Sequence, residues 1–171
     1  MSQIQTQNSK FFLRIATHED AELIVSFMKK LGSFQKMDDA ITVTPEKIEQ
    51  LLKSKKGEAV FGIYENQPLA FAYFYHKSSA FTGRSGLYID ALFIDDSMRG
   101  KKLGNIMMQY LSKHAIDRGC EMLEWGCLDW NIPAIEFYQK LGSYCVDEMR
   151  IYRLSPESLK ANAKLFLRHS N

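Results

Sequence analysis

Hydrophobic positions along the chain fall into two kinds of stretch, short strand-like runs and longer stretches with helical spacing. Strand-like runs cover residues 11–16, 59–64, 69–75, 87–94, 121–128 and 144–154. Helical spacing, with apolar residues three or four positions apart, covers residues 21–31, 44–53, 105–115, 133–141 and 155–167. Neither a doubly wound fold nor a sandwich has this order of elements, so the pattern predicts an α+β fold with a mixed sheet.

Capping residues mark the ends of the first helices. Thr17 and Asp20 resemble a capping box in which Asp takes the usual place of Glu, and Gly32 is placed to end the first helix. Thr44 followed by Pro45 is a typical helix start, with the proline in the first turn.

The most informative stretch runs from residue 87 to residue 108. An apolar strand over 87–94 is followed by turn residues, by a basic loop and by an apolar-striped helix. The loop carries two glycines and three cations, namely Gly100, Gly104, Arg99, Lys101 and Lys102. Glycine-rich backbone at a helix N-terminus exposes N–H groups and a positive dipole end, which together suit phosphate oxygens. A solvated basic turn that only caps the helix is the alternative.

A carboxylate interrupts the apolar strand, because Asp90 stands between Ile89 and Ala91. Burying an unpaired carboxylate is costly, so Asp90 must face a partner, a cleft or water. It is therefore a candidate catalytic residue, or a carboxylate that holds a nearby loop.

Composition and charge narrow the class of protein. The 171 residues include 46% hydrophobic and 25% charged residues with a net charge of +2, which fits a globular domain without a nucleic-acid partner. We expect a disordered tail over residues 1–10 and a single domain over 11–171. The odd cysteines Cys120, Cys127 and Cys145 favour neither a disulfide framework nor a metal site. With no membrane-length apolar run and no signal-peptide core, a cytoplasmic location without membrane attachment is expected.

Two motifs together resemble the GCN5-related N-acetyltransferases. Arg99 to Gly104 is similar to the family's acyl-CoA loop, Gln/Arg-x-x-Gly-x-Gly/Ala, with Lys102 in place of the middle glycine. Residues 131–142 resemble the more specific signature Asn-x-x-Ala-x-x-Phe-Tyr-x-x-x-Gly. The resemblance covers roughly residues 11–154. It implies a mostly antiparallel sheet flanked by helices, with acetyl-CoA bound where two central strands splay.

The resemblance also implies roles for individual residues. Tyr138 would protonate the CoA thiolate, and Asp90 would help to deprotonate the amine through water. The cofactor would bind along Leu92, Phe93, Ile94, Arg99, Gly100, Lys101, Lys102, Leu103, Gly104, Asn105 and Asn131. Lys102 would keep its phosphate contact if its backbone stays in the right-handed region. Tyr138 packed on the sheet beside Phe137 is the structural alternative.

The acceptor amine is less defined by the sequence. The motifs are similar to those of the diamine, polyamine and thialysine acetyltransferases, whose loop after the first helix is acidic. Here that loop keeps Asp38 and Asp39 but adds Lys36, which weakens the pull on a cation. Asp38, Asp39 and Trp130 are therefore candidate substrate-binding residues, or ordinary loop and core residues.

The sequence predicts an acetyl-CoA-dependent N-acetyltransferase that acts on a primary amine of a small molecule by direct attack. Acetylation of a protein or peptide amine and a non-catalytic acyl-CoA sensor are the alternatives. A covalent route through Cys127 lacks a neighbouring base and is less favoured. Family members are commonly homodimers, so a homodimer is expected.

Overall fold

A computed structural model describes residues 3–168 of the chain. The chain divides into two compact units, Met1–Gly126 and Cys127–Asn171, and each is described by itself. The expectation of a single domain over residues 11–171 stays a prediction.

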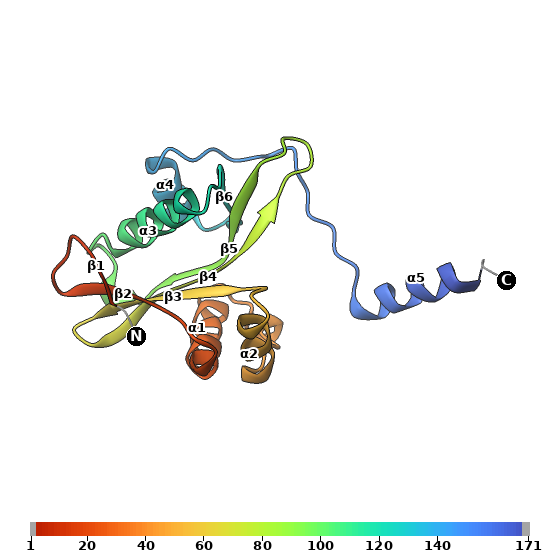
Figure 1. The fold of residues 1–171 in the computed structure, drawn as a ribbon, viewed down its shortest axis with the longest axis horizontal. Helices are drawn as coiled ribbons and strands as arrows, with labels where there is room; N and C mark the ends of the chain where they lie inside the picture. The colour runs from red at the N-terminus through yellow and green to blue at the C-terminus, as the bar shows by residue number, and fades with distance from the viewer. Residues whose placement is uncertain (1–2, 169–171) are drawn as a thin grey trace. The chain divides into compact units, whose positions relative to one another are not determined.

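The first unit is built on a six-stranded sheet whose strands follow one another in chain order (Figure 1). The strands are β1 (Gln3–Gln5), β2 (Phe11–Ile15), β3 (Glu58–Tyr64), β4 (Gln67–Ser78), β5 (Ser85–Ile94) and β6 (Met122–Trp125). Neighbouring strands are antiparallel from β1 to β5, and only β5 and β6 are parallel. The predicted mixed, mostly antiparallel sheet is therefore confirmed.

Helices cover both faces of this sheet (Figure 1). The helix α1 (Ala21–Phe34) and the helix α2 (Pro45–Lys53) lie on one face, and α3 (Leu103–Asp117) lies on the other. Short 3₁₀ turns η1 (His18–Asp20), η2 (Asp38–Ala40) and η3 (Asp96–Met98) join the elements. On the α1 face, Phe27 stacks on Phe71 at 5.2 Å and meets the edge of Phe93 at 5.9 Å. These aromatic contacts fix α1 over the centre of the sheet.

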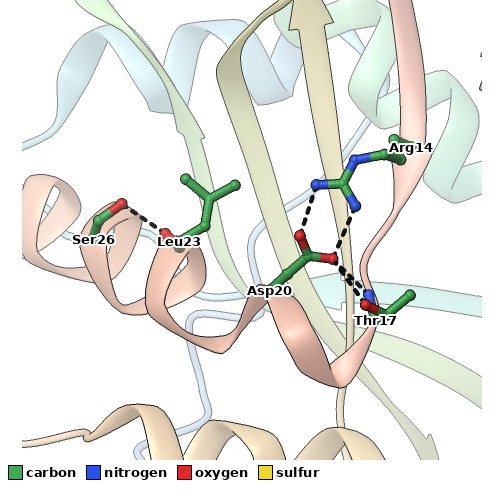
Figure 2. A network of polar contacts seen from close by, with 5 residues as sticks. All are labelled: Arg14, Thr17, Asp20, Leu23 and Ser26. Atoms are coloured by element: carbon green, nitrogen blue, oxygen red, sulfur yellow. Dashed lines mark hydrogen bonds and ion pairs between the residues drawn. The ribbon is translucent and has the colours of Figure 1, made fainter.

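The start of α1 is anchored to β2 by a polar network (Figure 2). The Asp20 carboxylate accepts a hydrogen bond from the backbone N–H of Thr17 at 2.8 Å. It also accepts two hydrogen bonds from the Arg14 guanidinium in a bidentate ion pair, each at 2.8 Å. The expected reach of Asp20 back to Thr17 is thus present. Ser26 uses its hydroxyl within α1, donating to the carbonyl of Leu23 at 2.7 Å (Figure 2).

The predicted end of α1 at Gly32 is wrong, because the helix continues to Phe34. Gly32 is instead a close-packing position, since a Cβ atom there would lie 2.5 Å from Cγ1 of Ile41. The predicted start of α2 is confirmed, with Thr44 accepting a hydrogen bond from the backbone N–H of Lys47 at 3.5 Å.

The structure also differs from expectation at the N-terminus. Residues 1–10 were expected to be disordered, yet β1 pairs with β2, with Gln3 opposite Arg14. The hydroxyl of Thr6 donates to the carbonyl of Phe11 at 2.5 Å and helps to hold the turn between the two strands. Residues 1 and 2 of the expected tail lie outside the described residues.

The second unit contains α4 (Ile132–Lys140) and α5 (Pro156–Arg168). Both helices agree with the sequence pattern. The strand predicted over residues 144–154 is wrong, because that segment is irregular and its apolar side chains, such as Tyr144 and Tyr152, are exposed. A strand requires a neighbour for its N–H and C=O groups, which hydropathy alone does not report.

In the part of the chain that the structure describes, no helix is both long and apolar enough to cross a bilayer.

Candidate active site

One edge of β5 is only half occupied. On its other edge, β5 pairs with β4 from Ser85 to Ile94, whereas its pairing with β6 covers only Gly86 to Ile89. Within the described residues, no strand pairs with this edge from Asp90 to Ile94. Extended backbone without a ladder partner presents N–H and C=O groups in the spacing that another extended chain requires. A linear ligand with amide groups would fit this edge.

Asp90 lies in a β-bulge at the point where the edge becomes free. Tyr73 of β4 lies opposite Ala91 and Phe74 lies opposite Ile89, so no β4 residue opposes Asp90. The extra residue disturbs the alternation of the strand and leaves the carboxylate exposed. The bulge therefore explains how an apolar strand contains a carboxylate at no burial cost.

Tyrosine side chains surround the bulge on the face that carries α1 and α2. Tyr73 is buried in the core of that face, and Tyr75 packs on Tyr88 with ring centroids 5.3 Å apart. Burial raises the pKa of the Tyr73 and Tyr75 hydroxyls, and the negative charge of Asp90 raises it further. Asp90 follows Tyr88 by two positions on β5, so the alternation of side chains up to the bulge places it on the same side of the sheet as these tyrosines.

The Asp90 carboxylate differs from its acidic neighbours in its lack of a cation. Asp95 is paired with Lys30 at 3.6 Å, and Glu124 is paired with Lys77. Among the described residues, none of the ion pairs involves Asp90. An ammonium group on a ligand would meet a carboxylate that is not ion-paired with any residue the structure describes.

The loop after β5 leads directly into the N-terminus of α3. Gly100 has φ +77°, and Lys102 immediately precedes the helix with φ 60° and ψ 15°. The condition under which Lys102 would keep its phosphate contact, a right-handed backbone, is therefore not met, because the residue takes the left-handed conformation that glycine adopts at lower cost. The sharp turn aims the first turn of α3 toward the end of β5.

The first turn of α3 has free hydrogen-bonding capacity. The N–H groups of Leu103, Gly104 and Asn105 belong to the first turn, which has no carbonyl partner within the helix. In the described part of the chain, no side chain caps this helix N-terminus. Together with the positive end of the helix dipole, these groups are suited to bind an anion.

The basic side chains of the loop are mostly held by local contacts. Arg99 is paired with Asp96 at 2.6 Å and lies 4.8 Å from the ring centroid of Phe34. Lys101 lies 5.0 Å from the ring centroid of Tyr64. Lys102 is exposed. Of the three cations, Lys102 is therefore the one whose side chain is available to a bound anion without breaking such a contact.

The predicted strand-end residues differ in what they offer. Phe93 is buried and packs on α1, whereas Leu92 and Ile94 are half-buried. What the three residues share is backbone along the free edge of β5, so any role in cofactor binding would be played by their main-chain groups.

The acidic residues Asp38 and Asp39 lie in η2, where Asp38 accepts a hydrogen bond from Ser33.

The remaining candidates lie in the second unit and are described within it. Asn131 caps α4, with its side chain accepting from the backbone N–H of Ala134 at 3.4 Å. Tyr138 packs on Phe137 with ring centroids 5.2 Å apart. Burial, with a smaller contribution from Cys127, raises the pKa of the Tyr138 hydroxyl to about 12. This hydroxyl stays protonated at neutral pH and is able to donate a proton. Trp130 is half-exposed.

Sequence reasoning missed the tyrosines Tyr73, Tyr75 and Tyr88. Their alternation along β4 and β5 places them on one face, and that signal was available in the sequence. Their position beside Asp90 was not, because it depends on the register across the bulge.

Comparisons with known proteins identify the family and several relatives of this chain. Residues 25–143 match the Acetyltransferase (GNAT) family. The chain is 33% identical over 95 residues to the L-ornithine N5-acetyltransferase NATA1 of Arabidopsis thaliana, a match that covers 56% of this chain and 42% of that protein. It is 29% identical over 128 residues to the thialysine N-epsilon-acetyltransferase of Caenorhabditis elegans, covering 75% of this chain and 79% of that protein.

A solved structure supports the fold. An integron cassette protein from the mobile metagenome of V. cholerae superimposes with a TM-score of 0.75 at 21% identity, covering 92% of this chain and 99% of that one. The family match begins within α1 at Val25 and includes the half-occupied edge of β5, the loop into α3 and the signature around Tyr138. The chain therefore belongs to the GNAT acetyltransferase family, and it is an enzyme of the acetyltransferase class.

Proposed function

We propose that the protein is an acetyl-CoA-dependent N-acetyltransferase that transfers an acetyl group to the primary amine of a small molecule. The observation that carries the proposal is the continuous path from the free edge of β5 to the uncapped N-terminus of α3. The path offers extended backbone first and orphan N–H groups after it. This order matches a ligand with an amide-containing arm that ends in phosphates.

Residues on this path would bind the cofactor through the main chain. The backbone groups of Leu92, Phe93 and Ile94 would pair with the amides of the pantetheine arm as an added strand does. The N–H groups of Leu103, Gly104 and Asn105 would hold the pyrophosphate, with the side chain of Lys102 adding a positive charge, because the N–H groups of Arg99 and Lys101 already donate to backbone carbonyls in the loop. Asn131, which caps α4, is proposed to lie along the same arm.

Acetyl-CoA supplies a thioester whose carbonyl carbon accepts the amine. The amine must arrive without its extra proton, and Asp90 is the carboxylate that would take this proton through a water molecule. The amine nitrogen then bonds to the carbonyl carbon, the carbon–sulfur bond breaks, and the nitrogen gives up its second proton to water, from which Tyr138 later regains the proton that it donates. Tyr138 would give its hydroxyl proton to the departing thiolate, so that CoA leaves as a thiol.

The small-amine acceptor is supported by the unpaired carboxylate of Asp90 and its tyrosine surroundings. The names of the relatives point the same way, since they act on ornithine and on thialysine. Asp38 and Asp39 remain proposed contributors to the attraction of a cation, and Trp130 remains a proposed wall of the acceptor site. Diamines, polyamines and lysine-like amino acids are all within this proposal.

Exposed apolar side chains in the second unit support a homodimer. Ile151, Leu159 and Phe166 are each more than half exposed. Apolar side chains gathered in one segment are typical of a surface that a partner covers. Light scattering of the purified protein would test whether it is a dimer. We further propose that the protein is cytoplasmic.

The experiment that tests the activity is the initial rate of CoA thiol release from acetyl-CoA. The amine panel would contain spermidine, putrescine, lysine, thialysine, an aminoglycoside and a peptide. Turnover with a small amine supports the proposal. Turnover with the peptide alone would replace it with a protein acetyltransferase, and CoA binding without turnover would favour a sensor.

A further inference from the structure

An ion pair lies beside the tyrosines on the same face of the sheet as Asp90. Lys77 of β4 is paired with Glu124 of β6, and its ammonium lies 5.5 Å from the ring centroid of Tyr88 on the strand between them. The side chains of Lys77 and Glu124 are 35% and 42% exposed. Both side chains are therefore partly open to a ligand, although Oε2 of Glu124, the atom that pairs with Lys77, is itself buried.

The register of the strands orders these groups along the sheet. Lys77 lies opposite Gly86, Tyr75 lies opposite Tyr88, and Tyr88 lies beside Glu124 of β6. Asp90 follows Tyr88 by two positions on β5. The groups thus form a line, with the free carboxylate at one end, the tyrosine pair in the middle and the ion pair at the other end.

Electrostatic effects on Tyr75 agree with this order. Burial raises the pKa of the Tyr75 hydroxyl most, Asp90 and Tyr88 raise it further, and Lys77 lowers it. The hydroxyl therefore lies within the electrostatic reach of both Asp90 and Lys77.

The ends of the line differ in the ligand charge that each prefers. Asp90 is a carboxylate without a cation, so it attracts an ammonium group. Lys77 and Glu124 present one positive and one negative group side by side, which is the complement of a zwitterion. The stretch between them is lined by the aromatic rings of Tyr75 and Tyr88, which pack well against methylene groups.

Building on the proposed function, we propose that the acceptor is an α-amino acid with a terminal primary amine, and that Lys77 and Glu124 bind its zwitterionic head. Lys77 would pair with the α-carboxylate and Glu124 with the α-ammonium. The methylene chain would lie along the tyrosine pair and present the terminal amine to Asp90.

The spacing suits such a ligand. The Lys77 ammonium lies over the ring of Tyr88. From Tyr88 to Asp90 the backbone of β5 advances by roughly 7 Å, because each residue of a strand advances about 3.3 Å. This separation is comparable to the reach of an extended lysine or ornithine side chain.

The same arrangement disfavours a simple diamine. A diamine carries an ammonium at both ends, so its distal ammonium could pair with Glu124, but it brings no carboxylate for Lys77 and places a second cation beside the Lys77 ammonium. An acceptor that lacks only the α-carboxyl group should therefore have a lower kcat/KM than the amino acid. Lysine with cadaverine, and ornithine with putrescine, are pairs that differ only in that group.

Steady-state kinetics on these pairs tests the inference. For the wild-type enzyme, kcat/KM for lysine or ornithine should exceed that for its diamine by about tenfold or more, the range of one charge-assisted hydrogen bond. Lys77→Met should lower kcat/KM for the amino acids by about the same factor while leaving the diamines unchanged or improved. Lys77→Glu should reverse the preference. If Lys77→Met lowered kcat/KM equally for the amino acid and for its diamine, the inference would be overturned.

A control and a second readout separate this inference from the proposed function. Lys113→Met removes a cation from an exposed ion pair with Asp117 on α3. This variant should keep the preference for lysine over cadaverine and for ornithine over putrescine. Calorimetric titration of lysine and cadaverine into the CoA-saturated protein does not depend on turnover. Tighter binding of lysine, lost in Lys77→Met, supports the inference even if no acetyl transfer is detected. If lysine binds no better than cadaverine, the inference fails, whether or not an amine is acetylated.

Discussion

Arg14 and Asp20 are joined by two parallel contacts of 2.8 Å between the guanidinium and the carboxylate. Both side chains are largely buried, with 17% and 13% exposed. The pair ties the end of β2 to the first turn of α1, and α1 in turn covers Phe71 and Phe93 beneath the candidate site. Its strength should therefore be measurable in the stability of the first unit.

Asp20→Asn should lower the free energy of unfolding by about 2 kcal/mol, because a charge-assisted, two-pronged contact is lost. Partial burial raises the pKa of the Asp20 carboxyl, but Arg14 and the backbone N–H of Thr17 lower it below its usual value overall. A lowered pKa in the folded state stabilises the protein above pH 3.8, and this contribution is lost as the pH falls through the folded-state pKa.

Urea unfolding of wild type and Asp20→Asn at a series of pH values would check this prediction. The difference between them should shrink in acid. Glu65→Gln, which breaks an exposed ion pair with Lys10, is the matched control and should have no measurable effect. A difference for Asp20→Asn that stays constant with pH would contradict the electrostatic explanation.

Lys102 should tolerate glycine but not a β-branched residue, because it precedes α3 at φ 60°. Lys102→Val should lower the free energy of unfolding by about 1–2 kcal/mol, the cost of forcing this backbone onto a branched side chain. Lys102→Gly should change it by less than about 1 kcal/mol, because relief of strain and the greater freedom of the unfolded chain oppose each other.

Calorimetric titration with CoA completes the Lys102 test. Lys102→Val should weaken CoA binding because the turn that aims the first helical N–H groups is distorted. Lys102→Gly should retain binding apart from the loss of the side-chain charge. Equal CoA affinities for the valine and glycine variants would show that the turn does not position the cofactor.

Tyr138→Phe should lower turnover by about 10²–10⁴-fold, the range for loss of a general acid, without a change in thermal stability. Because burial raises the pKa of the Tyr138 hydroxyl to about 12, it stays protonated through the neutral and mildly alkaline range. The wild-type pH–rate profile should therefore show no loss of activity from Tyr138 below about pH 10. An unchanged rate in Tyr138→Phe would remove the hydroxyl from the mechanism.

Asp90→Asn should depress activity most at low pH, where the acceptor amine is mostly protonated and most needs a base. Initial rates across pH with wild type and Asp90→Asn provide the measurement. Asp117→Asn on α3, which removes a different exposed carboxylate, should leave the profile unchanged. Parallel profiles for Asp90→Asn and wild type would make Asp90 a structural residue of the bulge.

His114 should make the protein less stable in mild acid. Its ring lies between Tyr110, at 5.4 Å, and Phe74, at 5.5 Å, and its Nε2 atom is buried without a hydrogen-bond partner among residues 3–168. Burial, and then the charge of Arg118, lowers the pKa of His114 below 6.5 despite the opposing charges of Glu58 and Asp117. The unfolded chain therefore binds the proton more readily, so stability falls as the pH drops below 6.5.

Unfolding midpoints in urea, measured across this pH range, would test the role of His114. His114→Phe keeps a ring in the stack and should lose part of the acid sensitivity. His76→Phe removes an exposed histidine of β4 and serves as the control. An identical pH dependence for wild type and His114→Phe would contradict the prediction.

Much of the fold could be predicted because its local signals are strong. The apolar run of β5 and the helical period after Asn105 indicated the strand, the loop and α3 directly. Thr44 with Pro45 located the start of α2. The end of α1 could not be predicted, because a glycine near the end of a helix pattern usually marks a C-cap. Gly32 is instead required by close packing against the side chain of Ile41, a tertiary contact that spacing along the helix does not reveal.

The candidate site was predicted in outline but not in geometry. The motifs pointed to Asp90, the loop and Tyr138, whereas the bulge depends on how β5 aligns with β4. The left-handed backbone of Lys102 was unexpected because lysine rarely adopts it. The ion pair of Lys77 and Glu124 joins strands that are distant in the sequence, so no local pattern indicated it.

The order of strands in the sheet has a consequence for folding. The pairs β1–β2, β3–β4 and β4–β5 join segments that are close in sequence, so each closes only a short loop and is expected to form early. The parallel pair of β5 and β6 must wait for the whole of α3, which lies between them in the chain. During synthesis, β6 is therefore the last strand to join the sheet, and because it pairs with β5 only as far as Ile89, the part of the β5 edge proposed to hold the cofactor is left for the ligand.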